Sequence, residues 1–198
     1  MGPVVIETDR LQLRAWERDD APAFVELFSH AEVNRFITDG EPVTEEQALR
    51  YIDRYERLQR ERGWCRWALE LKREPDALAG FCGVGCTFAP EIELGWTLRR
   101  DLWGEGLATE AARGALDYCF GTVGFARIVS AIDPENARSI AVARRLGMTA
   151  EGTLEIGETK LLRFVTENPL AEMPADPRFV TDCEGEAAGS SLHEQPEL

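Results

Sequence analysis

A short glycine-containing loop between a strand-like and a helix-like segment constrains this chain more than any other feature. Residues 91–98 have a strand-like pattern, and the loop after them opens directly into a helix that begins near Ala108. Gly104 and Gly106 keep side chains away from the first helical turn, where free N–H groups and the helix dipole favour an anion. The segment therefore predicts a site that holds a pyrophosphate through backbone groups. The alternative is a tight turn that only packs the helix closely against the strand.

Two common glycine motifs do not fit this loop. The third glycine of the dinucleotide-binding fingerprint would stand at Thr109, and the acidic residue expected about twenty positions further on is missing near residues 127–130. The phosphate-loop motif also fails, because no Gly-Lys-Ser or Gly-Lys-Thr follows. The loop must serve another class of anionic ligand, or none.

Hydrophobic periodicity predicts a mixed α/β layer fold with a mostly antiparallel first half. A helix with an Asp20 cap follows the first strand, and the Thr44–Gln47 capping box opens a second helix. The predicted strands cover residues 5–16, 65–71, 78–87, 91–98, 127–132, 148–154 and 161–167. The predicted helices cover about residues 20–28, 44–60, 108–122 and 136–146.

The charge is acidic and unevenly spread. The chain has 198 residues, with 36 Asp and Glu against 22 Lys and Arg, and a net charge of −14. This disfavours nucleic acids and anionic membranes, which need a basic face, and leaves room for basic partners such as amines. Residues 171–198 hold seven acidic residues against Arg178 and few large apolar ones, so we expect a disordered acidic tail after a single domain at residues 1–170.

Targeting and metal signals are weak. No run approaches the roughly 18 apolar residues that span a bilayer, and the first eight residues do not resemble a signal peptide. Five cysteines, an odd number, predict reduced thiols in a cytoplasmic protein. Cys82 and Cys86 lie too far apart along a strand to share an ion, so we expect no metal site and predict that the cysteines belong to the core.

Three segments together resemble a known family. They are residues 8–14 (TDRLQLR), residues 93–96 with 103–111 (ELGW and WGEGLATEA), and residues 133–139 with 145–148 (DPENARS and RLGM). The chain is similar to the Gcn5-related N-acetyltransferases (GNAT), and within them to the branch that acetylates the N-termini of ribosomal proteins (RimJ/RimL type). Trp103 stands where the wider family has Gln or Arg, although Trp is usual in the branch.

The resemblance implies a GNAT-like fold and acetyl-CoA as cofactor. The fold would have a central mixed, mostly antiparallel sheet of about seven strands, flanked by about four helices. A bulge near residues 95–96 would free backbone N–H groups for the acetyl carbonyl. The residues expected to bind the cofactor are Trp96, Thr97, Leu98, Trp103, Gly104, Gly106, Leu107, Ala108, Thr109 and Asn136.

The same resemblance assigns catalytic roles. The acetyl group would pass directly from the thioester to an amine, which needs a base, an oxyanion donor and an acid for the thiolate. Glu93 is the expected base, acting through water, and its alternative is a solvent-facing strand residue. Ser139 is the expected acid, because Ala143 replaces the Tyr of many family members; its alternative is an ordinary first-turn serine. Asn136 is also a good helix cap.

The acceptor is expected to be a primary amine. A peptide N-terminus has a pKa of roughly 8 against roughly 10.4 for Lys, and is the easier substrate. A small amine (aminoglycoside, polyamine or amino acid) remains an alternative, as do a non-catalytic acetyl-CoA-binding module and an interaction protein whose acidic tail mimics nucleic acid. The resemblance points to Arg35 and Phe36 as substrate-binding residues and leaves room for a homodimer. Glu151, Glu155 and Glu158 could attract a cationic acceptor or form a solvated loop.

Overall fold

One mixed sheet dominates the computed structural model, which describes residues 2–38, 40–88, 91–156 and 159–169. Its strands lie in the order β1-β2-β3-β4-β5-β6-β8-β7. They are β1 (Val4–Glu7), β2 (Leu11–Arg14), β3 (Arg66–Leu71), β4 (Glu74–Phe88), β5 (Glu91–Leu98), β6 (Arg127–Ile132), β7 (Thr149–Ile156) and β8 (Thr159–Glu167). The helices are α1 (Ala21–Leu27), α2 (Ala31–Asn34), α3 (Glu45–Arg62), α4 (Leu107–Tyr118) and α5 (Ala137–Arg145). The mixed α/β prediction is confirmed.

The first predicted strand is wrong in detail, because residues 5–16 form the hairpin β1–β2. Thr8 closes its turn: the Thr8 N–H donates to the Leu11 carbonyl at 3.0 Å, and Thr8 Oγ1 accepts from the Leu11 N–H at 3.1 Å. The sheet therefore has eight strands in place of about seven. Asp20 is the N-cap residue of α1, as expected, but its carboxylate accepts from Arg14 and from the Glu17 N–H and makes no side-chain hydrogen bond to the helix.

Helix α3 begins and ends as its sequence predicts. Thr44 Oγ1 accepts from the Gln47 N–H at 3.2 Å, and the Gln47 side chain accepts from the Thr44 N–H at 2.8 Å. Gly63, with φ of 77°, ends the helix in the left-handed conformation that favours glycine. The capping box therefore fixes where this helix lies along the chain.

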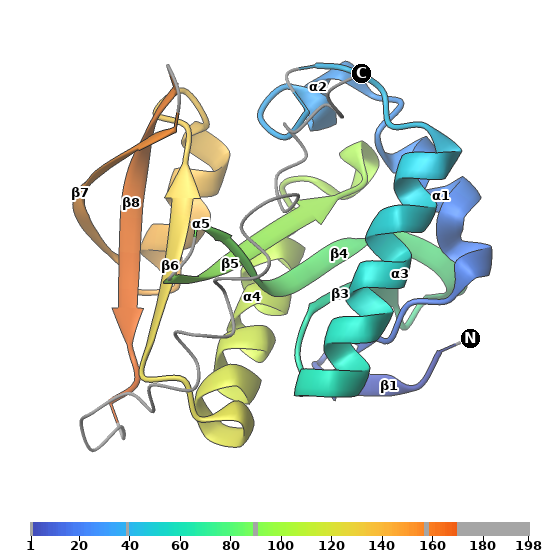
Figure 1. The fold of residues 1–198 in the computed structure, drawn as a ribbon, viewed down its shortest axis with the longest axis horizontal. Coiled ribbons are helices and arrows are strands. Elements are labelled where there is room, and N and C mark those ends of the chain that lie inside the picture. Colours follow the sequence, from blue (N-terminus) through green and yellow to red (C-terminus); the bar gives the residue numbers. More distant parts are fainter. Residues whose placement is uncertain (1, 39, 89–90, 157–158, 170–198) are drawn as a thin grey trace.

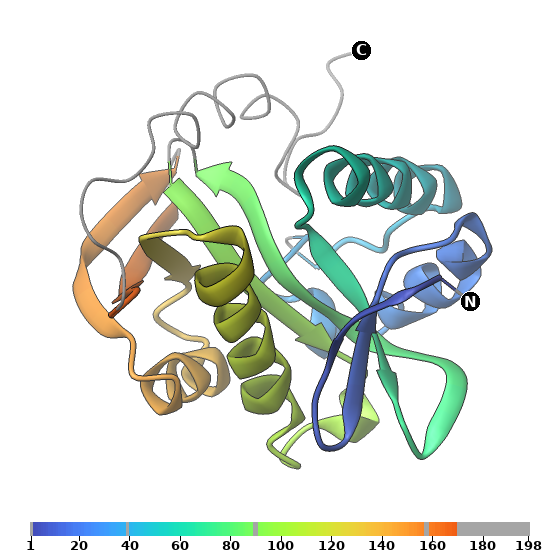
Figure 2. The same ribbon diagram turned by 90° about the horizontal axis from the view of Figure 1, so that it is seen from below.

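Helices cover both faces of the sheet. Figure 2 shows α3 and α1 on one side of the strands and α4 on the other. Beneath α1 and α3 an aromatic cluster fills the space to the sheet, with Phe24 and Phe81 stacked at 5.7 Å between ring centroids. Its other members are Trp16, Phe28, Tyr51 and Tyr55. This packing supports the strands that carry the candidate site.

Strands β5 and β6 form the parallel pair of an otherwise antiparallel sheet. Within the described residues their register holds one pair, Glu93 with Val129, next to a hydrogen bond from Ser130 Oγ to the Leu94 carbonyl at 2.8 Å. Beyond this point the strands diverge (Figure 1). Because they are parallel, they lead at the same edge of the sheet into the N-termini of α4 and α5. The opening between them is the natural place for a ligand.

Three further predictions concern the tail, membrane spans and the cysteines. The tail at residues 171–198 lies outside the described residues. No helix in the described part of the chain is long and apolar enough to cross a membrane. Cys65, Cys82 and Cys119 are buried, free thiols. Cys86 is also buried, but it is disulfide-bonded. The expectation of uniformly reduced thiols therefore fails at Cys86.

Candidate active site

The loop from β5 to α4 needs its glycines for backbone conformation. Gly104 has φ of 88° and Gly106, the N-cap of α4, has φ of 80°, where other residues are strained. A Cβ at Gly104 would have no heavy atom within 4 Å, and one at Gly106 would meet the Arg10 guanidinium at 3.8 Å. The first turn of α4 is therefore open on this side, as a ligand held by backbone N–H groups requires.

An orphaned hydroxyl lies in the same helical turn. Thr109 is the third residue of α4, and its Oγ1 is buried without a hydrogen-bond partner among the described residues. A buried hydroxyl without a partner costs about 1–3 kcal/mol. A phosphate oxygen at the helix N-terminus would supply that partner, so this turn fits the pyrophosphate of acetyl-CoA.

Trp103 contacts both the end of β5 and the first turn of α5. Its indole N–H donates to the Leu98 carbonyl at 2.9 Å and fixes the ring at the end of β5. The guanidinium of Arg100 lies 4.8 Å from the ring centroid, and that of Arg138, in the first turn of α5, lies 4.7 Å from it. Two cationic groups thus lie beside the glycine loop. The sequence did not point to Arg138, since a lone arginine in a helical turn carries no motif.

Asn136 and Ser139 occupy the first turn of α5. The Asn136 side-chain oxygen accepts from the Ser139 N–H at 3.1 Å, so the helix-cap alternative is confirmed. The Asn136 side-chain amide and the Ser139 hydroxyl have no protein partner within the described ranges. Both groups therefore remain available to a ligand.

Glu93 is buried, with 7% of the residue exposed, which excludes the solvent-facing alternative. Arg66 Nη2 donates to Glu93 Oε2 at 2.7 Å. Burial alone would lower the pKa of the Arg66 guanidinium, but the charge of Glu93 and the contact with Tyr55 raise it above its ordinary value. The carboxylate is therefore held by a permanently charged partner.

Arg66 reaches Glu93 from β3 by crossing β4. Gly85 pairs with Glu93 in the β4–β5 register, and a Cβ added at Gly85 would lie 3.7 Å from Arg66 Nε. A Cβ at Gly95 would lie 3.1 Å from the guanidinium carbon. The two glycines leave room for the arginine over the sheet. The sequence shows these glycines, but only the register reveals that they lie beneath one side chain.

The predicted bulge at residues 95–96 is wrong. Strand β5 pairs with β4 without a register shift from Glu93 to Leu98. Divergence from β6 instead leaves the other edge of residues 95–98 without a strand partner within the described residues. Trp96 is half-buried on this stretch, while Thr97 and Leu98 are buried. The unpaired backbone groups thus result from the divergence of β5 and β6, where a bulge was expected.

The remaining cofactor candidates contribute in different ways. Leu107 is 1% exposed and packs in the core, so any contact it makes to a ligand must come from its backbone. Ala108 is half-buried in the same turn and leaves the helix N-terminus uncrowded.

Arg35 and Phe36 lie at the end of α2. Arg35 Nη2 pairs with Glu135 at 2.7 Å, and its guanidinium lies 4.9 Å from the Phe36 ring centroid. Glu135 directly precedes Asn136, so the structure brings the substrate candidates close to the first turn of α5. The pair is exposed on both sides, which makes its contribution to stability small.

The acidic residues expected to attract a cationic acceptor are paired with basic side chains. Glu151 accepts from Arg127 at 2.7 Å and pairs with Arg163 at 3.3 Å. Glu155 lies 3.8 Å from Lys160. Glu158 lies outside the described residues. Glu151 and Glu155 therefore do not form an uncompensated acidic patch for a cationic acceptor.

Cysteine and metal chemistry find little support. Burial raises the pKa of Cys82 to about 12 and raises the pKa of Cys65 and Cys119 well above the ordinary value. These thiols therefore stay protonated near neutral pH and are poor nucleophiles. No group of three or more His, Cys, Asp or Glu suited to a metal ion occurs in the part of the chain that the structure describes.

Comparisons with known proteins identify the family. Residues 10–149 match the family model described as an acetyltransferase (GNAT) domain. An uncharacterized N-acetyltransferase, p20 of Bacillus licheniformis, is 32% identical over 149 residues, covering 74% of this chain and 83% of the relative. An acetyltransferase from Agrobacterium tumefaciens str. C58 is 27% identical with a TM-score of 0.71, over 84% of this chain and 95% of that one.

A further solved structure, the RimL ribosomal L7/L12 alpha-N-protein acetyltransferase in complex with coenzyme A, has a TM-score of 0.68 at 17% identity. It covers 83% of this chain and 98% of the solved one, and at that identity the likeness concerns the fold. The chain belongs to the GNAT acetyltransferase family. It is an N-acetyltransferase, acetyl-CoA is its cofactor, and its acceptor is an amine.

Proposed function

We propose that the protein acetylates the α-amino group of a peptide or protein N-terminus. The observation that carries the proposal is the divergence of β5 from β6, which opens the sheet beside Glu93 and between the N-termini of α4 and α5. When bound there, acetyl-CoA supplies the activated acetyl thioester. The first turn of α4, from Gly106 to Thr109, would hold its pyrophosphate, and the Asn136 amide would hold its pantetheine arm.

Glu93 accepts the proton of the attacking amine, through water. Arg66 Nη2 donates to one oxygen of this carboxylate at 2.7 Å and fixes its position. Backbone N–H groups on the open edge of residues 95–98 donate to the oxyanion. The Ser139 hydroxyl gives a proton to the departing thiolate.

The choice of an N-terminus follows from acidity and charge. An α-amino group is roughly two pKa units easier to deprotonate than a lysine or an alkylamine. A polyamine carries several positive charges and would favour a cluster of free carboxylates. The pairing of Glu151 with Arg127 and of Glu155 with Lys160 leaves no such cluster between these residues.

The experiment is a competition between acceptors. The protein is incubated with isotope-labelled acetyl-CoA, a library of peptides with free N-termini, spermidine and an aminoglycoside, and the products are identified by mass spectrometry. We expect labelled peptide N-termini in excess over labelled small amines. Preferential labelling of spermidine or the aminoglycoside would contradict the proposed acceptor.

A matched pair of variants tests the base. Glu93→Gln should lower kcat by about 100-fold or more, the usual contribution of a general base. Glu91→Gln is the control, because Glu91 lies on the same strand but pairs with Arg163. Equal activity of the two variants would contradict the role of Glu93.

A further inference from the structure

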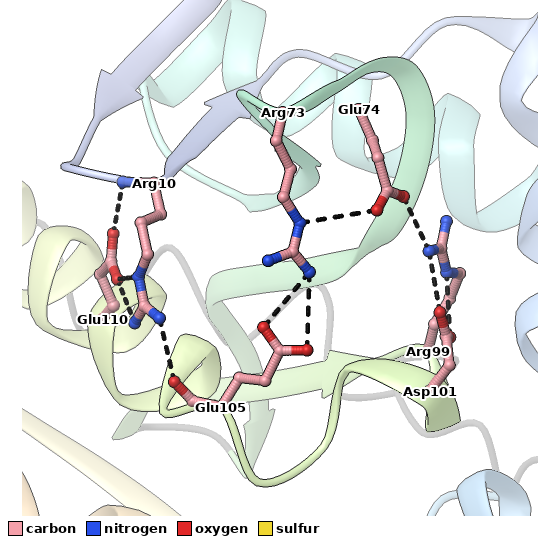
Figure 3. Close-up of polar contacts among 7 residues, drawn as sticks. All are labelled: Arg10, Arg73, Glu74, Arg99, Asp101, Glu105 and Glu110. Carbon is pink, nitrogen blue, oxygen red and sulfur yellow. Dashed lines mark hydrogen bonds and ion pairs between the residues drawn. The ribbon is translucent and has the colours of Figure 1, made fainter.

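The turn of the first hairpin is bonded to the first turns of α4. Glu110 Oε1 accepts from Thr8 Oγ1 at 2.6 Å and from the Arg10 N–H at 2.8 Å. Its other oxygen, Oε2, accepts from Arg10 Nε at 2.6 Å. Figure 3 shows the Arg10 side chain extended from this turn across the start of the helix. Arg10 Nη2 also lies 2.6 Å from Oε2, so four donor atoms on one carboxylate fix both the turn and the guanidinium.

Arg10 also reaches the glycine loop. Its Nη1 donates to the backbone carbonyl of Glu105 at 3.0 Å (Figure 3). That carbonyl belongs to the peptide group whose N–H is that of Gly106, the N-cap of α4. In a trans peptide the C=O and N–H bonds point in opposite directions. The hydrogen bond from Arg10 therefore turns the Gly106 N–H away from the hairpin.

The orientation of this peptide depends on an outside contact. Gly106 has φ of 80°, and Gly104 has φ of 88°, so both positions can rotate more freely than other residues. The Glu105 side chain is turned outward, where it pairs with Arg73 Nη2 at 3.2 Å (Figure 3). This pairing keeps the carboxylate next to Gly106 away from an incoming anion.

We propose that Arg10 is a positioning residue for the pyrophosphate, acting by holding the Glu105–Gly106 peptide with its N–H directed to the ligand. The inference rests on the proposed placement of acetyl-CoA at the first turn of α4. It assigns the hairpin turn, about a hundred residues away in sequence, to the cofactor site. Arg10 acts through the backbone and does not touch the reacting atoms.

The test compares two acetyl donors that differ in the pyrophosphate. Acetyl-CoA contains the group, and S-acetylpantetheine lacks it together with the 3′-phosphoadenosine. Arg10→Ala should weaken acetyl-CoA binding about tenfold, measured by calorimetry, while the affinity for S-acetylpantetheine, measured in the same way, changes less than twofold. Arg18→Ala is the matched control, because Arg18 is an exposed arginine paired with Asp53, and it should alter neither value.

A second variant guards against misfolding of Arg10→Ala. Arg10→Lys keeps the charge, but it lacks the planar fork by which Arg10 bonds Glu110 through Nε and the Glu105 carbonyl through Nη1. We expect it to fold and to lose part of the affinity for acetyl-CoA alone. An equal loss for both donors, or no loss in either variant, would overturn the positioning role. Failure of the acceptor experiment would instead overturn the proposed function, since donor affinity is measured without an acceptor.

Discussion

Replacing Arg66 by Met should destabilise the protein strongly, because it leaves Glu93 buried without its charged partner. The two side chains are 15% and 9% exposed, so solvent screens the pair little. Removing one partner of a buried pair typically costs about 3–5 kcal/mol. A surface pair would give about 1 kcal/mol or less. The burial of both groups therefore predicts a free energy of unfolding lower by about 3 kcal/mol at pH 7.

The assay is urea denaturation of four proteins: wild type, Arg66→Met, Glu93→Gln and the double variant. The double variant should recover much of the lost stability, because the amide introduced by Glu93→Gln has no charge that would remain buried without a partner. The cycle also separates the Glu93 interaction from the contact between Arg66 and Tyr55, which both Arg66 variants lose.

A loss of stability below about 1 kcal/mol in Arg66→Met, unchanged by Glu93→Gln, would refute this reasoning. It would mean that the carboxylate finds water or another donor in place of Arg66. The proposed base would then be a mobile, hydrated group, and its fixed position would no longer support its catalytic role.

Four further outcomes follow from the site and its supports. Gly106→Arg should abolish acetyl-CoA binding in calorimetry while the variant remains folded, and unchanged affinity would contradict the loop assignment. Ser139→Ala should lower kcat by about 100-fold with little change in acetyl-CoA affinity, whereas a wild-type rate would reject the acid role. Iodoacetamide should leave Cys65, Cys82 and Cys119 unlabelled in the native protein, as judged by peptide mapping; fast labelling would contradict their burial. Desolvation alone would raise the pKa of Glu110, but the hydrogen bonds from Thr8 and Arg10 lower it below its ordinary value of 4.5. The ionised carboxylate therefore stabilises the fold above that ordinary value, and this contribution is lost as the pH falls through the lowered pKa. Thermal melts of Glu110→Gln should lack this acid-side loss, and an identical pH profile would count against it.

Local sequence signals predicted the parts of the fold that depend on near neighbours. The Thr44–Gln47 capping box and the Asn136 cap both appear, because cap and partner lie three residues apart. Residues 5–16 misled because alternation continues through a turn that Thr8 closes with its own side chain. Periodicity alone cannot detect such a turn.

The interactions that define the site are long-range, and no local pattern encodes them. Arg66 and Glu93 meet only when three strands adopt one register. The edge of residues 95–98 lacks a strand partner because β5 and β6 share a single pair among the described residues. The bulge near Gly95 was expected from resemblance, yet that glycine instead makes room for Arg66. The glycines in the sequence were therefore enough to locate the loop before α4. The role of the glycines on the sheet could be seen only in the structure.

The hydrogen bonds between the first hairpin and α4 also set an order of events during synthesis. Arg10 and Glu110 are separated by 100 positions. At about 5–20 residues per second, the hairpin turn leaves the ribosome about 5–20 seconds before its helical partner exists. The glycine loop acquires its final conformation only when the first hairpin, which is synthesised early, contacts α4, which is synthesised later. Competence to bind acetyl-CoA should therefore appear only after the chain has been synthesised through Glu110.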